Sequence, residues 1–454
     1  MARPMTAFGP VVRKMSRSFG DGGLNARHLT QIGHLLSGNA MSSVLMLIST
    51  AIAARTLTVE KFGVFVMILT FVRLIERIAR FESWQPLIKF ATDREADGNP
   101  DQLARLYLYG LLLDVGAAIV AAGTALALVA LVGPLVGVDT VYLPLVAIAC
   151  LGTLFNITGM PTAALRLAGQ FRTIAYSQLV AQLLRIALAF FCWWKSLGVE
   201  SFLIAWTAAQ IFGAMIFLAF GFAALKVQRI PNPLRASPRH LMRDFPGFLT
   251  FASSTNLSMT MRTLTQEADT LLVGALAGPS PAGFYHIAKR LAKLAQQVGA
   301  QAQAVMYPDM ARLWASRRYR DLRMLTRRIQ GVLGAIGLAV LAAVAAFGEP
   351  LVTFAAGSKY GDIGPLLVAQ VVSVIFIMHT APSRSVLLSM GRPHLVLVVA
   401  AFGTAVFFAT AVLLIPGMGA MGASIAQIAF AAVTALWMDV AWRRTLRGLA
   451  DRTP

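Results

Sequence analysis

Long apolar runs alternate with short polar connections along the whole chain. Each run is long enough to cross a bilayer as an α-helix, which takes about 20 residues. The pattern predicts twelve such helices, at residues 35–54, 62–80, 106–132, 141–165, 174–194, 202–225, 247–274, 283–307, 330–355, 364–388, 395–415 and 420–441. Because no connection is long enough for a soluble domain, the sequence predicts an all-α integral membrane protein.

The composition agrees with this class. Hydrophobic residues make up 57% of the chain, charged residues only 13%, and the mean hydropathy is +0.68. A soluble domain carries about 25% charged residues.

Cys150 and Cys192 both lie in apolar runs, so we interpret them as small buried hydrophobes, and no metal site or cofactor is predicted. The sequence also lacks a phosphate-binding loop and a His-Glu-x-x-His motif, so no enzymatic activity is predicted.

The basic residues are sorted between the two sides of the predicted membrane. Of the 40 Lys and Arg residues, those outside the apolar runs gather at the two termini and after even-numbered helices. Only Arg55, Lys61, Lys195 and Lys359 lie in the alternate set of loops. By the positive-inside rule, both termini of this multi-pass protein are predicted to be cytoplasmic. This distribution explains the net charge of +20 without nucleic acid as a partner, and the basic loops should contact membrane lipids.

An internal repeat divides the chain into two halves. Residues 58–65 and 278–285 both form a short polar turn followed by glycine and aromatic residues that open an apolar helix, and the alignment pairs Arg73 with Lys293. Six predicted helices precede the basic, proline-containing stretch 229–235 and six follow it. An even number gives both halves the same orientation, which predicts two six-helix lobes related by pseudo-twofold symmetry along the membrane normal.

The predicted organisation follows from these boundaries. It comprises a basic cytoplasmic tail without the features of a cleavable signal peptide, an N-terminal lobe, a linker, a C-terminal lobe and a second tail, at residues 1–33, 34–226, 227–245, 246–442 and 443–454.

Several cations remain inside the predicted spans. A charge at the bilayer centre costs about 2.5–3.5 kcal/mol on insertion scales, so such residues should face one another, water or a ligand. In the eighth helix the polar residues recur at three- and four-residue steps, which places them in one stripe. The candidate substrate-binding residues are Arg73, Arg77, Arg185, Arg262, Lys289, Arg290 and Lys293.

Acidic residues in the spans are fewer, and we predict ion-coupling roles for Asp114, Glu267 and Asp269. Two of them have structural alternatives. Asp114 could instead form a salt bridge with an arginine of the second helix such as Arg77, and Asp269 could cap a helix or pair. The i,i+4 pairs Glu76–Arg80 and Asp439–Arg443 are interpreted as ion pairs near the inner ends of their helices.

The order of features resembles the polysaccharide (O-antigen, Wzx-type) flippases of the multidrug/oligosaccharidyl-lipid/polysaccharide (MOP) exporter superfamily. The resemblance rests on residues 53–65 in the first half, where a small-residue helix end precedes a turn and Phe62-Gly63. In the second half it rests on Asp269, the apolar stretch up to Gly274, and residues 283–291 with Gly-x-Tyr and a basic-Leu pair. It covers about residues 30–445.

The resemblance implies a protein of the bacterial inner membrane that moves an undecaprenyl-pyrophosphate-linked oligosaccharide from the cytoplasmic to the periplasmic leaflet. It would do so by alternating access of two lobes around a cation-lined cavity. It also implies a polysaccharide polymerase and export machinery as partners, in O-antigen, capsule or exopolysaccharide biosynthesis. Two alternatives stay open. A drug or cation exporter of the same superfamily would use buried carboxylates, and a membrane enzyme of polysaccharide assembly would need a catalytic domain or a large outer loop.

Overall fold

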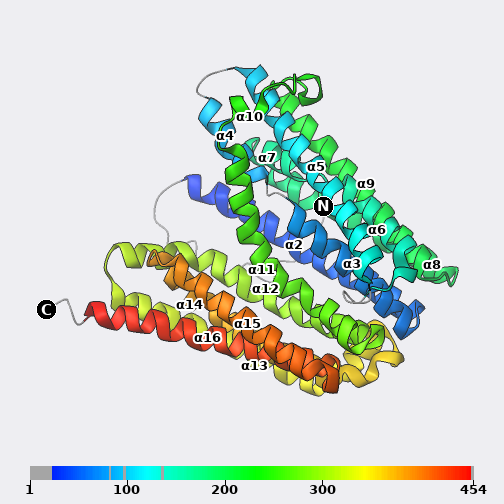
Figure 1. The fold of residues 1–454 in the computed structure, drawn as a ribbon. Helices are drawn as coiled ribbons and strands as arrows, with labels where there is room; N and C mark the ends of the chain where they lie inside the picture. Colours follow the sequence, from blue (N-terminus) through cyan, green and yellow to red (C-terminus); the bar gives the residue numbers. More distant parts are fainter. Residues whose placement is uncertain (1–22, 81–82, 96–98, 134–137, 451–454) are drawn as a thin grey trace, which may run out of the picture.

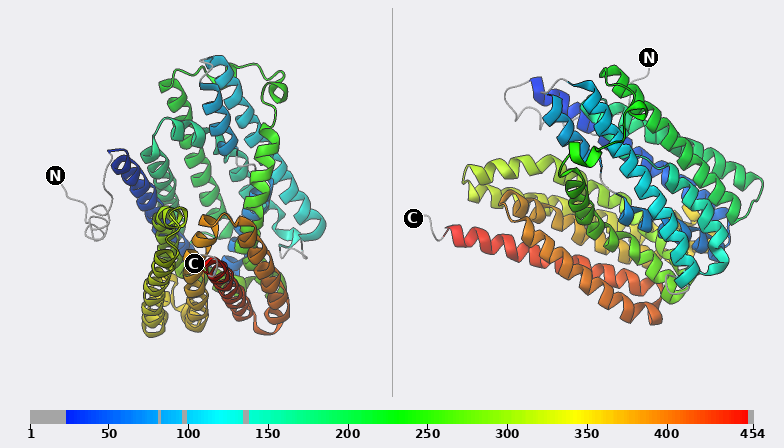
Figure 2. Two further views of the ribbon diagram at one scale, coloured as in Figure 1. Left: turned by 90° about the vertical axis from the view of Figure 1, so that its left-hand side faces the viewer. Right: turned by 45° about the horizontal axis from the view of Figure 1, so that its top comes forward.

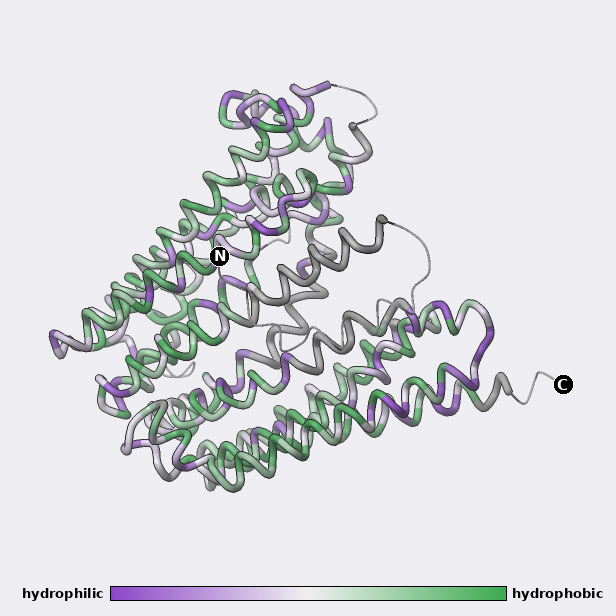
Figure 3. Tube along the Cα trace, turned by 180° about the vertical axis from the view of Figure 1, so that it is seen from behind, coloured by the Kyte–Doolittle hydropathy of each residue, from purple (hydrophilic) through white to green (hydrophobic). Residues whose placement is uncertain are grey.

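In the computed structural model of the protein, residues 23–80, 83–95, 99–133 and 138–450 are described, apart from the side chains of some helical residues, including 254–255, 257–266 and 298–305. Every regular element in this part of the chain is helical. Eight of the helices are long and apolar enough to cross a membrane by length and composition. Along the tube, hydrophobic residues occupy the middle of the helices and hydrophilic residues gather toward the connections (Figure 3).

The N-terminal lobe contains the first six predicted spans. Its elements are α2 (Gly23–Thr56), α3 (Val59–Ala79), α4 (Trp84–Glu95), α5 (Pro100–Val132), the short η2 (Thr140–Tyr142), α6 (Leu143–Phe155), α7 (Gly159–Leu167), α8 (Phe171–Trp194) and α9 (Val199–Val227). The fourth span, predicted as one helix over 141–165, is divided between α6 and α7.

The linker between the lobes contains η3 (Pro233–Arg235) and α10 (Leu241–Asp244). The C-terminal lobe then follows with the other six predicted spans. Its elements are α11 (Phe248–Ala277), α12 (Pro279–Ala315), α13 (Tyr319–Ala356), η4 (Ser358–Ile363), α14 (Gly364–Ser389), α15 (Pro393–Met418) and α16 (Ala420–Ala450). The predicted fold class, an all-α membrane protein of two six-helix lobes, is therefore confirmed.

The two lobes form a V (Figure 1). They meet where α2 joins α3 and α11 joins α12, and they diverge toward the side where α4, α10 and the end of α16 lie, as the turned views also show (Figure 2). Helices α3 and α12 pack against each other, α3 packs against α11, and α2 contacts α12 and α13. The helices of the first two and of the seventh and eighth spans thus form the interface.

The hydrophobic core reflects this shape. One cluster of buried residues unites the C-terminal lobe with the closed end of the N-terminal lobe, from Phe62 and Phe65 on α3 to Trp442 on α16. A second cluster fills the other end of the N-terminal lobe and includes Phe245 and Phe248, from the linker and the first turn of α11. Helix α11 therefore begins against the N-terminal lobe and continues into the C-terminal lobe.

Candidate functional site

Five of the predicted substrate-binding cations come together at the lobe interface. Arg73 on α3 interacts electrostatically with Arg185 on α8 and with Arg290 and Lys293 on α12, and Lys293 interacts with Lys289. We call these five residues the cation cluster. Arg185 is buried, Arg73, Lys289 and Arg290 are half-buried, and Lys293 is exposed. Cations from both lobes therefore share one electrostatic environment.

The two remaining predicted cations differ. Arg77 follows Arg73 by one turn of α3 and has an exposed side chain. The side chain of Arg262 lies outside the described residues.

Buried Arg185 is held by neutral groups. Its guanidinium donates to the side-chain oxygen of Gln182 at 3.1 Å, lies 2.9 Å from the sulfur of Met46, and stands 5.4 Å from the ring centre of Trp206. Its Nε has no hydrogen-bond partner in the described structure. A buried guanidinium without a carboxylate partner is costly unless an anion approaches it.

Glu267 and His286 lie within the cation cluster. Glu267 interacts electrostatically with Arg73, and with the cations of α12. His286 accepts a hydrogen bond of 3.0 Å from Nε of Arg290, which fixes Nε2 of the imidazole as an acceptor. Even when Asp269, which pairs with Lys289, is added to Glu267, two carboxylates do not neutralise five cations, so the group keeps a net positive charge.

Asp269 is fully buried beside the cluster and has protein partners on every side. Its Oδ1 accepts from the backbone N–H of Thr270 at 2.6 Å and from Lys289 at 2.7 Å. Its Oδ2 accepts from the Tyr285 hydroxyl at 2.8 Å and from the side-chain amide of Gln427 at 3.1 Å. The predicted possibility that Asp269 pairs is confirmed, and its role in ion coupling stays a prediction.

Asp114 holds the broken fourth helix of the N-terminal lobe. One carboxylate oxygen accepts from the backbone N–H groups of Gly159 and Met160, at 2.9 and 3.3 Å, and the other accepts from Ser83 Oγ at 2.6 Å. It thus caps the start of α7, where the first amides lack helical partners. A Cβ on Gly159 would lie 1.7 Å from Ser83 Oγ and 2.7 Å from the carboxylate, so glycine is needed there.

The alternative that Asp114 pairs with Arg77 is therefore wrong, although Arg80 of the same helix does interact with the carboxylate electrostatically. The buried carboxylate is satisfied by Ser83 and the α7 backbone, while the Arg77 side chain is exposed. Ion coupling through Asp114 stays a prediction.

At the carboxyl end of α6, a cation, Arg80, satisfies the free backbone oxygen, whereas an anion caps the start of α7. Arg80 donates to the backbone oxygen of Asn156 at 2.7 Å and pairs with Glu76, which confirms that predicted ion pair. Glu76 in turn accepts from the side chains of Asn156 at 2.7 Å and Thr153 at 3.2 Å. The sequence analysis missed this break, although Asn156, Gly159 and Pro161 in close succession are a recognisable helix-breaking signal.

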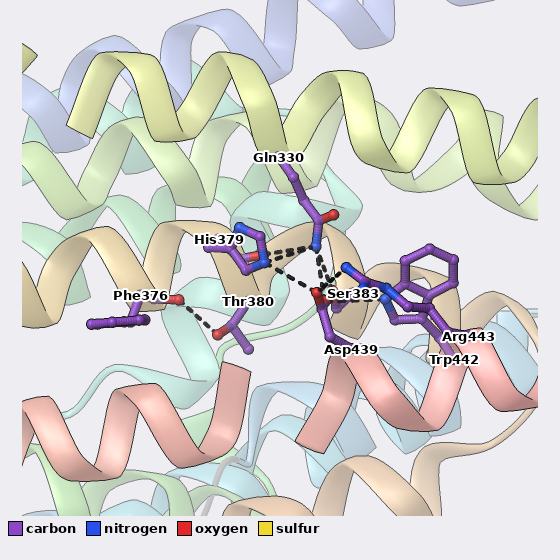
Figure 4. A network of polar contacts seen from close by, with 8 residues as sticks. All are labelled: Gln330, Phe376, His379, Thr380, Ser383, Asp439, Trp442 and Arg443. Carbon is purple, nitrogen blue, oxygen red and sulfur yellow. Dashed lines mark hydrogen bonds and ion pairs between the residues drawn. The ribbon is translucent and has the colours of Figure 1, made fainter. Parts of the chain in front are cut away.

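A further polar network lies inside the C-terminal lobe, where α13, α14 and α16 meet (Figure 4). The Asp439 carboxylate accepts from Gln330 at 2.9 Å, from Trp442 at 3.1 Å, and from Ser383. It also pairs with Arg443 at 2.7 Å and contacts His379 at 3.2 Å. The predicted Asp439–Arg443 pair is confirmed, but it is one part of a network that the sequence analysis did not anticipate.

The closed end of the interface is built from the predicted internal repeat. Gly63 and Gly283, which the repeat aligns, face each other: a Cβ on Gly283 would lie 3.4 Å from the Gly63 Cα, and one on Gly63 would lie 1.9 Å from the Pro279 oxygen. Lys359 adds two bonds of 3.2 Å to the backbone oxygens of Arg55 and Leu57 at the end of α2, and Arg55 donates to the backbone oxygen of Phe354. Two features thus join the lobes. The backbones approach closely at the two glycines, and Lys359 and Arg55 each bind carbonyl groups at the carboxyl end of a helix in the other lobe.

Comparison with known structures identifies the class of fold. An inward-facing multidrug resistance MATE family transporter of the MOP superfamily matches with a TM-score of 0.73 and 14% identity, over 91% of this chain and 96% of that one. The lipid II flippase MurJ in an inward closed conformation matches with a TM-score of 0.72 and 13% identity, over 90% and 87%. An outward-facing MATE structure gives a lower TM-score of 0.59 at 15% identity, over 93% and 96%. The fold is that of a MOP-superfamily membrane transporter.

The sequence comparison then gives the family. Residues 52–365 match the profile of a family described as polysaccharide biosynthesis protein, and the chain belongs to that family. The inner membrane protein YghQ of Escherichia coli (strain K12) is 27% identical over 329 residues, which are 71% of this chain and 91% of YghQ. The predicted resemblance to the polysaccharide flippases of the MOP superfamily is confirmed.

Proposed function

We propose that the protein is a flippase that moves an undecaprenyl-pyrophosphate-linked oligosaccharide across the bacterial inner membrane during polysaccharide biosynthesis. The observation that carries the proposal is the cation cluster, in which Arg73 and Arg185 from one lobe meet the cations of α12 from the other. Membership of the polysaccharide biosynthesis family and the fold shared with a lipid II flippase support it.

The chemistry of a pyrophosphate suits this cluster. Guanidinium groups present a planar fork that matches two phosphate oxygens, and a buried one binds them more strongly than an exposed one. Arg185 combines deep burial with the lack of a carboxylate partner among the described residues, so it is our first candidate for direct contact. The half-buried Arg73 and Arg290 would complete the contact from either lobe.

The V shape supports alternating access. The lobes diverge on the side of α4, α10 and the end of α16, where the basic connections lie (Figure 1). By the positive-inside rule we assign that side to the cytoplasm, with both termini inside. In this state the cation cluster would receive a headgroup from the cytoplasmic leaflet, and opening of the Gly63–Gly283 contact would release it outside.

Ion coupling is best proposed through Glu267. Asp114 and Asp269 already accept hydrogen bonds on both carboxylate oxygens, whereas Glu267 lies among the cations. A change in its protonation would alter the net charge presented to the substrate. The alternative of drug or cation export is less compatible with a cluster of net positive charge.

Binding of undecaprenyl pyrophosphate to the purified protein tests this proposal. We expect Arg185→Gln and Arg73→Gln each to weaken binding about tenfold, because charge-assisted hydrogen bonds contribute about 1.5–3 kcal/mol. Lys61→Gln, at the closed end of α3, should leave binding unchanged, and undecaprenol without the pyrophosphate should bind weakly to all forms. Equal binding of both lipids by the wild type would contradict the proposal. Complementation of a polysaccharide-export mutant with the same variants provides the functional readout.

A further inference from the structure

A groove lies on the N-terminal lobe between α8 and α9, apart from the cation cluster. Its volume is about 510 Å³, and its lining includes Arg172, Tyr176 and Val180 from α8 and Phe220 and Val227 from α9. Just beyond Val180 the two helices come close together, since a Cβ on Gly213 of α9 would lie 2.4 Å from the Cβ of Ala181 of α8. The groove therefore occupies the ends of α8 and α9 on the side of the basic connections.

The polar side chains of the lining gather at one end of the groove, where Val227 of α9 also lies, and the deeper part is apolar. Gln170, Arg172 and Thr173 line the end at the α7–α8 turn, and Val180 and Phe220 line the deeper part. From Arg172 to Val180 the helix rises about 12 Å, roughly the distance from a headgroup phosphate into the hydrocarbon of one leaflet. Tyr176, 39% exposed, lies between the two zones, where aromatic side chains favour the membrane interface.

The charge of the groove selects its ligand. No Asp or Glu lines it, and Arg172 is its charged residue. The Arg172 guanidinium lies 5.8 Å from the centre of the Tyr176 ring, and within the described part of the chain it forms no ion pair. The guanidinium is exposed and can turn toward a phosphate. Lys226 and Arg229 flank Val227 in the sequence and add positive charge at this end of α9.

We infer that this groove is a binding site for an anionic phospholipid of the leaflet that contacts the basic connections. Arg172, with the polar groups of Gln170 and Thr173, would bind the phosphate, and Val180 and Phe220 would contact the acyl chain. A polar end at the interface and an apolar floor deeper in the membrane match the order of groups in a phospholipid. This inference does not depend on the proposed transport substrate.

Native mass spectrometry of the purified, detergent-solubilised full-length protein tests the inference. The probes are phosphatidylglycerol and phosphatidylcholine with identical acyl chains. We expect the wild type to bind the first phosphatidylglycerol molecule about tenfold more tightly than phosphatidylcholine. Arg172→Ala should abolish this preference, and Arg172→Lys should retain part of it. Arg235→Ala removes an exposed cation of the linker that does not line the groove, and it should behave as wild type.

A second variant separates the apolar from the polar contribution. Val180→Trp fills the floor of the groove without changing its charge, so it should weaken binding of both lipids about equally. If Arg172→Ala retains the preference for phosphatidylglycerol, or if Val180→Trp leaves both affinities unchanged, the groove is not the site. A monodisperse elution profile for each variant establishes that it is folded.

Discussion

The two lobes share one six-helix plan, but they bury their carboxylates for different purposes. In the N-terminal lobe, Asp114 and Glu76 satisfy the two ends of a broken fourth helix, and Arg80 completes the arrangement. In the C-terminal lobe the equivalent helix α14 is continuous, and its Ser383 and His379 contact Asp439 on α16. Similar buried acids thus hold a helix break in one lobe and join three helices in the other.

This difference shows that pseudo-symmetry constrains the backbone plan more than the polar interior. The glycines aligned by the repeat meet at the closed end of the lobe interface, and both lobes supply cations to the cation cluster. Away from this interface the two lobes satisfy their buried polar groups in different ways. Substitutions at comparable positions of the two lobes can therefore separate features that both lobes share from features of one lobe alone.

The largest difference is expected between two of the buried aspartates, Asp439 and Asp114. Asp439→Ala would leave Gln330, Trp442 and Arg443 without their shared acceptor and should destabilise the protein by about 3–5 kcal/mol. Asp114→Ala removes a helix cap and should cost only about 0.5–2 kcal/mol. Thermal denaturation in detergent measures both. Ser383→Ala serves as a milder control within the same network, and equal losses for the two aspartates would contradict the distinction.

The paired glycines should also respond unequally. Gly63→Ala would place a methyl group 1.9 Å from a backbone oxygen, so overpacking of about 1–3 kcal/mol is expected. Gly283→Ala meets a side chain at 3.3 Å, and a gain in helix propensity of up to about 1 kcal/mol offsets the closer contact. We expect a lower melting temperature for Gly63→Ala than for Gly283→Ala. A reversed order would mean that the closed end is packed differently from this structure.

The smallest effect is expected at the cations that cross the closed end. Lys359→Ala removes two hydrogen bonds to the carboxyl end of α2 and should cost about 0.3–1 kcal/mol. Lys195→Ala, at the carboxyl end of α8, is the matched control because Lys195 contacts the Trp194 ring of its own lobe. Denaturation of the two variants side by side provides the comparison. If Lys359→Ala loses no more stability than Lys195→Ala, the packing of Gly63 and Gly283 alone holds the closed end together.

The sequence predicted the helices well because the bilayer imposes their length. All twelve predicted spans correspond to helical segments, but several helices extend further than the apolar runs, such as α13, which begins at Tyr319 rather than at residue 330. Hydropathy marks the part of a helix inside the membrane, whereas backbone hydrogen bonding continues the helix into water. The break after Phe155 escaped prediction because the stretch from Thr140 to Leu167 is apolar enough as a whole to pass for one span, and the helix-breaking residues Asn156, Gly159 and Pro161 were not weighed against it.

The members of the cation cluster could be predicted from the sequence for a different reason. Charges inside apolar runs are costly, so their positions stand out, and the three- and four-residue spacing places Lys289, Arg290 and Lys293 on one stripe. Their acceptors did not stand out in the same way. Tyr285 and Gln427 bond Asp269 from two other helices, and such a meeting depends on how the helices pack rather than on spacing along the chain.

Helices α3 and α12 at the lobe interface carry charged residues inside their apolar stretches, and this must affect how they enter the membrane during synthesis. Helix α3, whose residues are all described, is not among the eight helices apolar enough to insert by composition, and α12 carries Lys289, Arg290 and Lys293 along its length. A central arginine such as Arg73 adds about 2.5–3.5 kcal/mol to the insertion free energy of α3. We therefore expect α3 and α12 to become stably inserted only after their apolar successors have been synthesised, so that the order of assembly differs from the order of translation.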